Sequence, residues 1–182
     1  MSNYPEPKQD SAIQAPEGSV VSTDPGSDFL ITVQIEQQFE DRVDAGALEH
    51  LAVHVLQAEG RKGPLGLGVV VTTDEEVRAL NVRYLGHDYN TDVISFSMAD
   101  EDAADGFLTP TDRAPYLGDV VISYERAFEQ APDYGYTTPR EVANLLVHGI
   151  LHLLGWDDST DELRRIMQAR QEDLLRSAAF EG

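Results

Sequence analysis

The chain has 182 residues and a formal net charge of −20, because 33 acidic residues outnumber 13 lysines and arginines. Its length favours one domain, and 41% hydrophobic residues are enough for one core. It has no cysteine, which excludes disulfides, thiolate metal sites and cysteine nucleophiles. The negative charge repels polyanions and argues against DNA as a partner. A role on nucleic acid would need a local positive potential, from a metal ion and a few arginines in a cleft.

The N-terminal residues differ in composition from the rest of the chain. Residues 1–27 are rich in Pro, Ser, Gly, Asp and Glu and lack an apolar period, so we expect a disordered tail before a folded domain over 28–182. The sequence shows neither a signal peptide nor an apolar run of the roughly 18 to 20 residues that span a membrane. We therefore expect a cytoplasmic protein without a membrane partner.

The first half of the domain alternates strand-like and helix-like patterns. β-rich runs predict strands over 29–39 and 65–74, and apolar residues at helical spacing predict helices over 45–60 and 75–85. Either Thr73 or Asp74 is expected to cap the second helix.

Two further β-branched runs lie at 91–98 and 117–124, separated by an acidic segment with Gly and Pro. They predict paired strands joined by a long exposed loop. A short helix over 125–131 is expected to follow and to stop at Pro132 and the Gly135 region.

The helix with the strongest start signal runs from 139 to 154. Thr138 and Glu141 fit a capping box, and Pro139 occupies the first helical position. Gly155 is expected to end this helix in a left-handed conformation.

A last helix is predicted over 161–178, capped by Thr160. Together the elements predict an α+β (mixed α/β) fold with a single domain, in which helices pack on a small mixed sheet. A metal cleft is expected at the end of the helix 139–154.

Two histidines stand four residues apart near the end of that helix. His148 and His152 lie on one helical face and can reach the same ion, and the turn at Gly155 can bring Asp157 or Asp158 back as an oxygen ligand. Two His and one carboxylate leave a coordination position open, as in catalytic zinc sites. The alternative is that both histidines are hydrogen-bonded core residues, and the spacing alone does not decide between the two.

The residue after His148 is Gly149, whereas zinc peptidases of the H-E-x-x-H type carry their general-base glutamate there. This difference disfavours peptide hydrolysis. Gly149 either allows a backbone or a substrate to approach the helix, or serves as a packing glycine.

Three motifs resemble those of the YbeY family of metal-dependent endoribonucleases, also called ribosomal RNA maturation factors. HGILHLLGWDD (148–158) is similar to the family's H-G-x-L-H-L-x-G-Y-D-H, NTDVISFSM (90–98) to P-T-D-V-L-S-F-P, and YLGDVVIS (116–123) to L-G-D-I-V-I-C. The resemblance extends over about residues 30–178 and implies a metal site.

The resemblance implies that His148 and His152 are metal ligands, and that Asp158 stands where the family usually has a third histidine. One divalent ion is expected, most consistent with zinc, although the carboxylate makes manganese more acceptable. Asp157 matches the family's aspartate before the third ligand, and a turn-forming or ligand-supporting role is expected for it.

Two positions depart from the family pattern. Leu85 replaces an arginine that is suited to grip a scissile phosphate, and Asn90 replaces a proline. Arg83 and His87 lie nearby but not at the matching position, so the catalytic residues stay unassigned. Three polar residues of the strand motifs are expected to orient the histidines and shape the cleft, or else to form turns and strand ends: Asp92, Ser95 and Asp119.

By resemblance, the protein is expected to cleave single-stranded RNA in rRNA maturation and ribosome quality control, with ribosomal RNA and ribosomal particles or proteins as partners. A non-catalytic, metal-containing ribosome-assembly factor is the alternative, favoured by the acidic charge and the missing arginine. A metallopeptidase is a third reading, weakened by Gly149.

Overall fold

The computed structural model describes residues 19–21, 28–86, 88–97 and 115–180. It contains a five-stranded sheet in the order β1-β2-β3-β5-β4. β2, β3 and β5 are parallel, while β1 and β4 run antiparallel to their neighbours at the two edges. The predicted mixed sheet is therefore confirmed. The strands are β1 (Ser19–Val21), β2 (Phe29–Ile35), β3 (Leu65–Thr72), β4 (Val93–Ser97) and β5 (Tyr116–Ser123).

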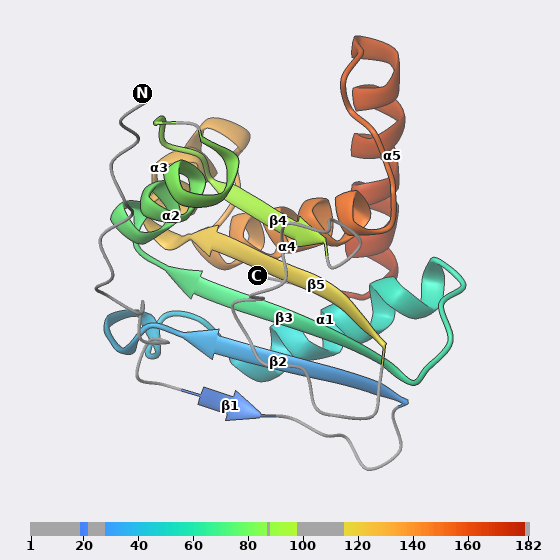
Figure 1. Cartoon of the computed structure of the whole chain (residues 1–182). Helices are drawn as coiled ribbons and strands as arrows, with labels where there is room; N and C mark the ends of the chain where they lie inside the picture. Colours follow the sequence, from blue (N-terminus) through green and yellow to red (C-terminus); the bar gives the residue numbers. More distant parts are fainter. Residues whose placement is uncertain (1–18, 22–27, 87, 98–114, 181–182) are drawn as a thin grey trace, which may run out of the picture.

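Helices cover both faces of this sheet (Figure 1). α1 and α4 pack on one face, α2 packs on the other, and α5 packs against α4 and α1. Because β3 has neighbours on both faces, it is a nearly continuous apolar run, and Val69, Val70 and Val71 are fully buried. The helices are α1 (Ala45–Ala58), α2 (Asp74–Leu80), a π-helical segment (Asn81–Leu85), α3 (Tyr124–Tyr134), α4 (Thr138–Leu153) and α5 (Asp161–Ser177).

The structure corrects the predicted extent of the disordered tail. Ser19–Val21, inside the segment 1–27, form β1 and pair with β2. The reason is that β2 would otherwise expose one edge of unpaired backbone groups, which β1 satisfies. The other residues of the predicted tail lie outside the described residues, as does most of the predicted loop between β4 and β5.

Several element ends also differ from the prediction. β2 stops at Ile35 and the predicted strand end forms a 3-10 turn at Gln37–Phe39. α3 does not stop at Pro132 but continues to Tyr134 and ends at the left-handed Gly135. Gly135 and Tyr136 close the helix with backbone hydrogen bonds to the carbonyls of Pro132 and Ala131.

The start of α4 is shifted by one residue from the predicted capping box. Thr137, not Thr138, is the cap, and its hydroxyl accepts a hydrogen bond from the backbone N–H of Arg140. Glu141 is therefore not the partner of the cap. Its side chain is buried, with 2% of the residue exposed.

α4 is surrounded by the sheet, α1, α3 and α5, which explains why most of its residues are apolar. After Arg140, the polar side chains of α4 stand at positions i, i+3, i+7 and i+11, so they fall along one side of the helix: Glu141, Asn144, His148 and His152. None of the helices in the described part of the chain combines the length and apolar character needed to cross a bilayer.

Candidate metal centre

α4 ends in the tight turn that Gly155 was expected to make. The backbone N–H of Trp156 donates to the carbonyl of Leu151 at 3.0 Å, and that of Gly155 donates to His152 at 2.9 Å. This pair of bonds is the Schellman motif, which requires the positive φ of 92° found at Gly155. The turn sends the chain back past the last turn of the helix and brings Asp158 to the histidines.

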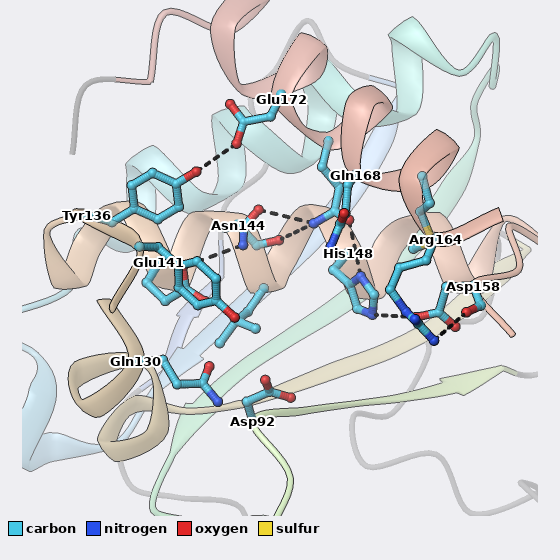
Figure 2. Close-up of a pocket in the computed structure, with 14 residues that line it drawn as sticks. Asp92, Gln130, Tyr136, Glu141, Asn144, His148, Asp158, Arg164, Gln168 and Glu172 are labelled. Atoms are coloured by element: carbon cyan, nitrogen blue, oxygen red, sulfur yellow. Dashed lines mark hydrogen bonds and ion pairs between the residues drawn. The ribbon is translucent and has the colours of Figure 1, made fainter. Parts of the chain in front are cut away.

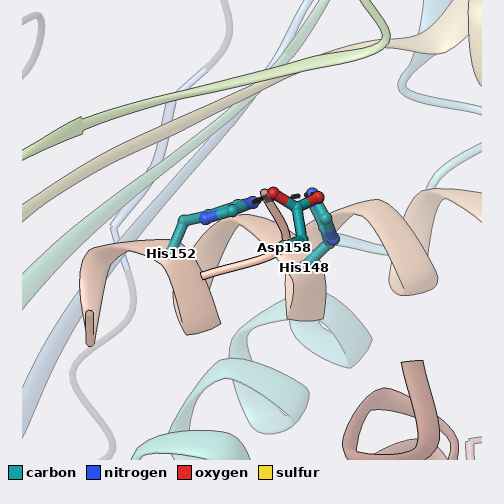
Figure 3. A group of neighbouring side chains, drawn as sticks. All are labelled: His148, His152 and Asp158. Carbon is teal, nitrogen blue, oxygen red and sulfur yellow. Dashed lines mark hydrogen bonds and ion pairs between the residues drawn. The ribbon is translucent and has the colours of Figure 1, made fainter. Parts of the chain in front are cut away.

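His148, His152 and Asp158 each offer one ligand atom, and these atoms lie within 4.8 Å of one another. The two imidazole Nε2 atoms are 3.0 Å apart. The carboxylate oxygens of Asp158 lie 4.0 Å from Nε2 of His148 and 3.8 Å from Nε2 of His152. Figure 3 shows the three side chains pointing toward one another at the end of α4. This group could bind a metal ion.

The other ring nitrogen of each histidine has its own hydrogen-bond partner. Nδ1 of His152 lies 3.1 Å from the carbonyl oxygen of Trp156. Nδ1 of His148 lies 3.3 Å from Oε1 of Gln171, whose amide nitrogen donates to the side-chain oxygen of Asn144 at 3.1 Å. Because a carbonyl oxygen can only accept, both Nδ1 atoms carry the proton. Such partners fix the ring orientation of metal-binding histidines in proteins.

The arrangement gathers acceptor atoms at one point. With Nδ1 protonated, Nε2 of His148 presents its lone pair to Nε2 of His152 and to the Asp158 carboxylate. Burial, and then the proximity of His152, lower the pKa of His148, so this imidazole is neutral at pH 7 and free to bind a cation. A divalent cation held here would accept the His148 lone pair and balance the charge of Asp158, so the residues fit a metal ion.

The structure assigns Gly149 to helix packing. A Cβ at this position would lie 2.5 Å from Cγ1 of Val120 on β5 and 3.0 Å from Oγ of Ser95 on β4. The Ser95 hydroxyl donates to the Gly149 carbonyl at 3.1 Å. Gly149, at the position where a zinc peptidase carries its general-base glutamate, therefore packs directly on the sheet. Ser95 positions the backbone of α4 rather than an imidazole.

The remaining polar candidates have separate roles. Asp157 is a turn residue, because its carboxylate accepts hydrogen bonds from the backbone N–H and the hydroxyl of Ser159, and these bonds lower its pKa. Asp119 on β5 accepts a hydrogen bond from the hydroxyl of Tyr116. Asp92 precedes β4 and shapes the cleft, since it lines both hollows beside His148.

Two hollows meet at His148. One has a volume of about 520 Å³ and lies among α3, α4 and α5, where its lining includes His148 and Asp158 (Figure 2). The other, of about 420 Å³, lies beside β4 and includes both histidines. A substrate can therefore reach the candidate metal centre through open space on two sides. The first hollow is called the α3–α5 chamber below.

Comparison with known proteins identifies the family. A family model described as Endoribonuclease YbeY matches residues 32–179. The chain belongs to the YbeY endoribonuclease family. A relative named Endoribonuclease YbeY from Roseiflexus sp. is 40% identical over 152 residues, which cover 83% of this chain and 94% of the relative. One from Bacillus velezensis is 41% identical over 136 residues, covering 73% and 87% of the two chains.

A solved structure shows the same fold. The solution structure of a protein from Thermotoga maritima matches with a TM-score of 0.50 and 21% identity, covering 81% of this chain and 91% of that one. The YbeY match spans all three motifs noted in the sequence, including the segment from His148 to Asp158. The side chain of Leu85 and all of His87 lie outside the described residues.

The structure adds site residues that the sequence reading of the YbeY motifs missed. Gln171 and Arg164 come from α5, and Glu141 and Asn144 come from α4. Glu141 and Asn144 could have been found from the sequence, because they continue the helical spacing of His148 and His152 toward the start of α4. The α5 residues carried no such signal, since only tertiary packing brings α5 beside α4.

Proposed function

We propose that this protein is a metal-dependent endoribonuclease that cleaves single-stranded RNA in rRNA maturation and ribosome quality control. His148, His152 and Asp158 hold one divalent cation, with zinc as the most consistent ion for two imidazoles and a carboxylate. The observation that carries the proposal is the convergence of ligand atoms from His148, His152 and Asp158, which lie within 4.8 Å of one another. Family membership supplies the RNA phosphodiester as the target.

A divalent cation held by these three residues would supply Lewis acidity and water activation at a phosphodiester. The chain's own residues prepare this site. Gln171 and the Trp156 carbonyl hold both imidazoles with Nε2 facing the centre. The two hollows on either side of His148 allow a strand to pass the centre rather than end at it. Such a path suits internal cleavage of a chain.

Arg164 is proposed to take the place of the family's arginine, whose position holds Leu85 here. It begins the chamber-facing side of α5 and donates to the carbonyl of Asp158 at 3.3 Å, which places its guanidinium beside the candidate ligand. Its ion pair with Asp161 is exposed, so a phosphate can take the place of the Asp161 carboxylate at a small cost in free energy. We place the protein in the cytoplasm with ribosomal RNA and ribosomal particles as its partners.

The net charge of −20 favours a second function, that of a non-catalytic ribosome-assembly factor. An acidic surface suits basic ribosomal proteins better than naked RNA. In that case the ion would hold the turn after α4 in place and would not act on a substrate.

The test uses the full chain with its metal content measured as purified. Single-stranded RNA is offered to the wild type, to a His148→Ala, His152→Ala double variant, and to a His50→Ala control on the exposed side of α1. We expect about one equivalent of zinc and cleavage in the wild type and the control, and loss of both in the double variant. A full complement of metal without RNA cleavage, together with binding to ribosomal particles, would instead establish the assembly factor. Cleavage of casein would identify a peptidase.

A further inference from the structure

The α3–α5 chamber extends away from the candidate metal centre and is larger than a metal site requires. Its volume of about 520 Å³ lies within the range of about 300 to 1,000 Å³ of small-molecule pockets. It shares His148 and Asp158 with the centre, and Figure 2 shows the other polar groups around the same space. One ligand can therefore occupy the chamber and the candidate metal centre at the same time.

Glu141 is the least expected member of the chamber. The residue is 2% exposed, yet its carboxylate receives one long hydrogen bond of 3.5 Å, from the amide of Asn144. A carboxylate has about four acceptor positions, so most of its capacity is available to a ligand. Burial raises the pKa of Glu141 to about 7. The Asn144 bond and Arg140 oppose this shift, and the Asp92 carboxylate adds to it.

The rest of the lining includes aromatic rings and amides beside the carboxylates of Asp92 and Glu172 and the apolar side chains of Leu145 and Met167. The rings of Tyr134 and Tyr136 stand 6.0 Å apart at an interplanar angle of 27°, and Tyr134 is 64% exposed. Gln130 from α3 and Gln168 from α5 add amide groups to the wall. A flat ligand with a polar edge can stack on the rings and bond to the amides. This is how proteins read unpaired RNA bases.

Arg164 fixes the direction of the ligand. It lines the same chamber and donates to the backbone carbonyl of Asp158, so its guanidinium lies at the end of the chamber beside the metal centre, away from Glu141 (Figure 2). A guanidinium binds two phosphate oxygens at once. A nucleotide with its phosphate near Arg164 thus has its base directed toward Glu141.

We propose that the α3–α5 chamber binds the nucleotide next to the scissile phosphate, with Arg164 on the phosphate and Glu141 on the edge of the base. This inference rests on the proposed RNA cleavage. The carboxylate of Glu141 only accepts when ionised, so it selects bases that donate from an amino group. Guanine is the best fit, because its N1–H and amino group lie side by side and match two carboxylate oxygens. Uracil, which carries no amino group, is the poorest fit.

The first test measures binding and does not depend on cleavage. Guanosine and uridine 5′-monophosphates are titrated at pH 8, where Glu141 is ionised, into the metal-loaded protein. We expect the guanine nucleotide to bind at least about tenfold more tightly, the effect of one hydrogen bond to a charged group. Glu141→Gln removes this preference. Glu49→Gln, a glutamate of similar burial in α1 that does not line the chamber, retains it.

Two further variants separate the parts of the nucleotide. Arg164→Gln weakens both nucleotides to the same extent but leaves the nucleoside guanosine unaffected, since the nucleoside has no phosphate. Tyr134→Ser weakens all of these ligands by about tenfold through loss of stacking. Because Tyr134 is exposed, this variant also tests the chamber if Glu141→Gln fails to fold.

RNA cleavage then distinguishes this inference from the function on which it rests. Oligonucleotides that differ in one base beside the cleavage point are compared, and guanine is expected to be preferred about tenfold. Cleavage without base preference, together with equal binding of the two nucleotides, would overturn the nucleotide subsite and leave the endoribonuclease intact. Selective guanine binding without any RNA cleavage would retain the subsite and reject the nuclease.

Discussion

The two histidines of the candidate centre are chemically equivalent but are held in different ways. His152 depends on a backbone carbonyl four residues later, within its own turn. His148 depends on the side chain of Gln171, which another helix supplies 23 residues later. A side-chain partner can be deleted by one substitution, whereas a backbone partner can be lost only if the turn itself changes. The two supports therefore predict different responses to mutation.

The largest effect is expected where the backbone support is broken. Gly155→Val places a β-branched residue at φ 92°, at a cost of about 1 to 3 kcal/mol, and moves both the Trp156 carbonyl and Asp158. We expect metal affinity to fall by about 100-fold, measured by competition with a chelating dye.

Gly135→Val is the matched control for this change. Gly135 also has a positive φ, of 71°, and a Cβ there would meet nothing within 4 Å, as at Gly155. Its helix ends away from the three ligand groups. The control should lose comparable stability and keep its metal affinity. Equal loss of affinity in both variants would mean that general destabilisation, not the turn, controls the site.

Glu141 lies on the same helix and is held less firmly than either histidine. Its hydrogen bond from Asn144 is 3.5 Å long, against 3.3 Å and 3.1 Å for the Nδ1 atoms of His148 and His152. The pKa of Glu141 is about 7 in the folded protein against 4.5 for the free side chain, so between these values the folded state holds a proton that the unfolded state has released. The free energy of unfolding therefore falls as pH rises through this interval, by on the order of 2 kcal/mol.

Glu141→Gln removes this titration. Urea unfolding of the wild type and the variant at pH 5 and pH 8 should show that the variant becomes relatively more stable at the higher pH, by about 2 kcal/mol. Parallel pH profiles of the two proteins would show that Glu141 is ionised in the folded state throughout, as an exposed glutamate is.

The convergence of His148, His152 and Asp158 could be predicted from the sequence because the parts that produce it are local. His148, His152, Gly155 and Asp158 lie within eleven residues, and helix geometry followed by one glycine turn is enough to bring them together. The order of strands and helices was likewise predictable, because the apolar periods are strong.

The features that the sequence did not reveal depend on tertiary packing, or on a choice between two residues or roles that the sequence permits equally. Gln171 reaches His148 only because α5 folds back on α4. Glu141 was assigned to a capping box because two adjacent threonines, Thr137 and Thr138, can both cap, and the structure selects the first. Gly149 had two interpretations that only the positions of Val120 and Ser95 could separate.

The side-chain support is expected to be weaker than the backbone support. Gln171→Ala leaves Nδ1 of His148 without its acceptor, and we expect metal affinity to fall by about tenfold. Gln171→Glu should preserve affinity, because a carboxylate accepts the same hydrogen bond and makes the imidazole more basic. Gln168→Ala, on the same helix and facing the chamber, controls for the change in helix sequence. Similar affinity in the wild type and the Gln171→Ala protein would show that the ring is held by packing alone.

The smallest effect on metal affinity is expected for Glu59, which is linked to His152 through Trp156. Trp156, whose carbonyl orients that ring, donates its indole N–H to Glu59 at 3.0 Å, and Arg170 donates to the same carboxylate at 2.7 Å. Glu59→Gln brings an amide N–H₂ toward Arg170 and loosens the indole. The backbone bonds of the turn remain, so metal affinity should fall by no more than about threefold.

Intrinsic fluorescence can follow this change directly, because Trp156 is the single tryptophan of the sequence. We expect a shifted emission maximum in Glu59→Gln while metal still binds with nearly wild-type affinity. If that variant lost as much metal affinity as Gly155→Val, the position of the Trp156 carbonyl would depend on the hydrogen bond from the indole to Glu59 rather than on the turn. His152 would then be held through side chains of Glu59, which follows α1, and Arg170 of α5, and the contrast between the two histidines would disappear.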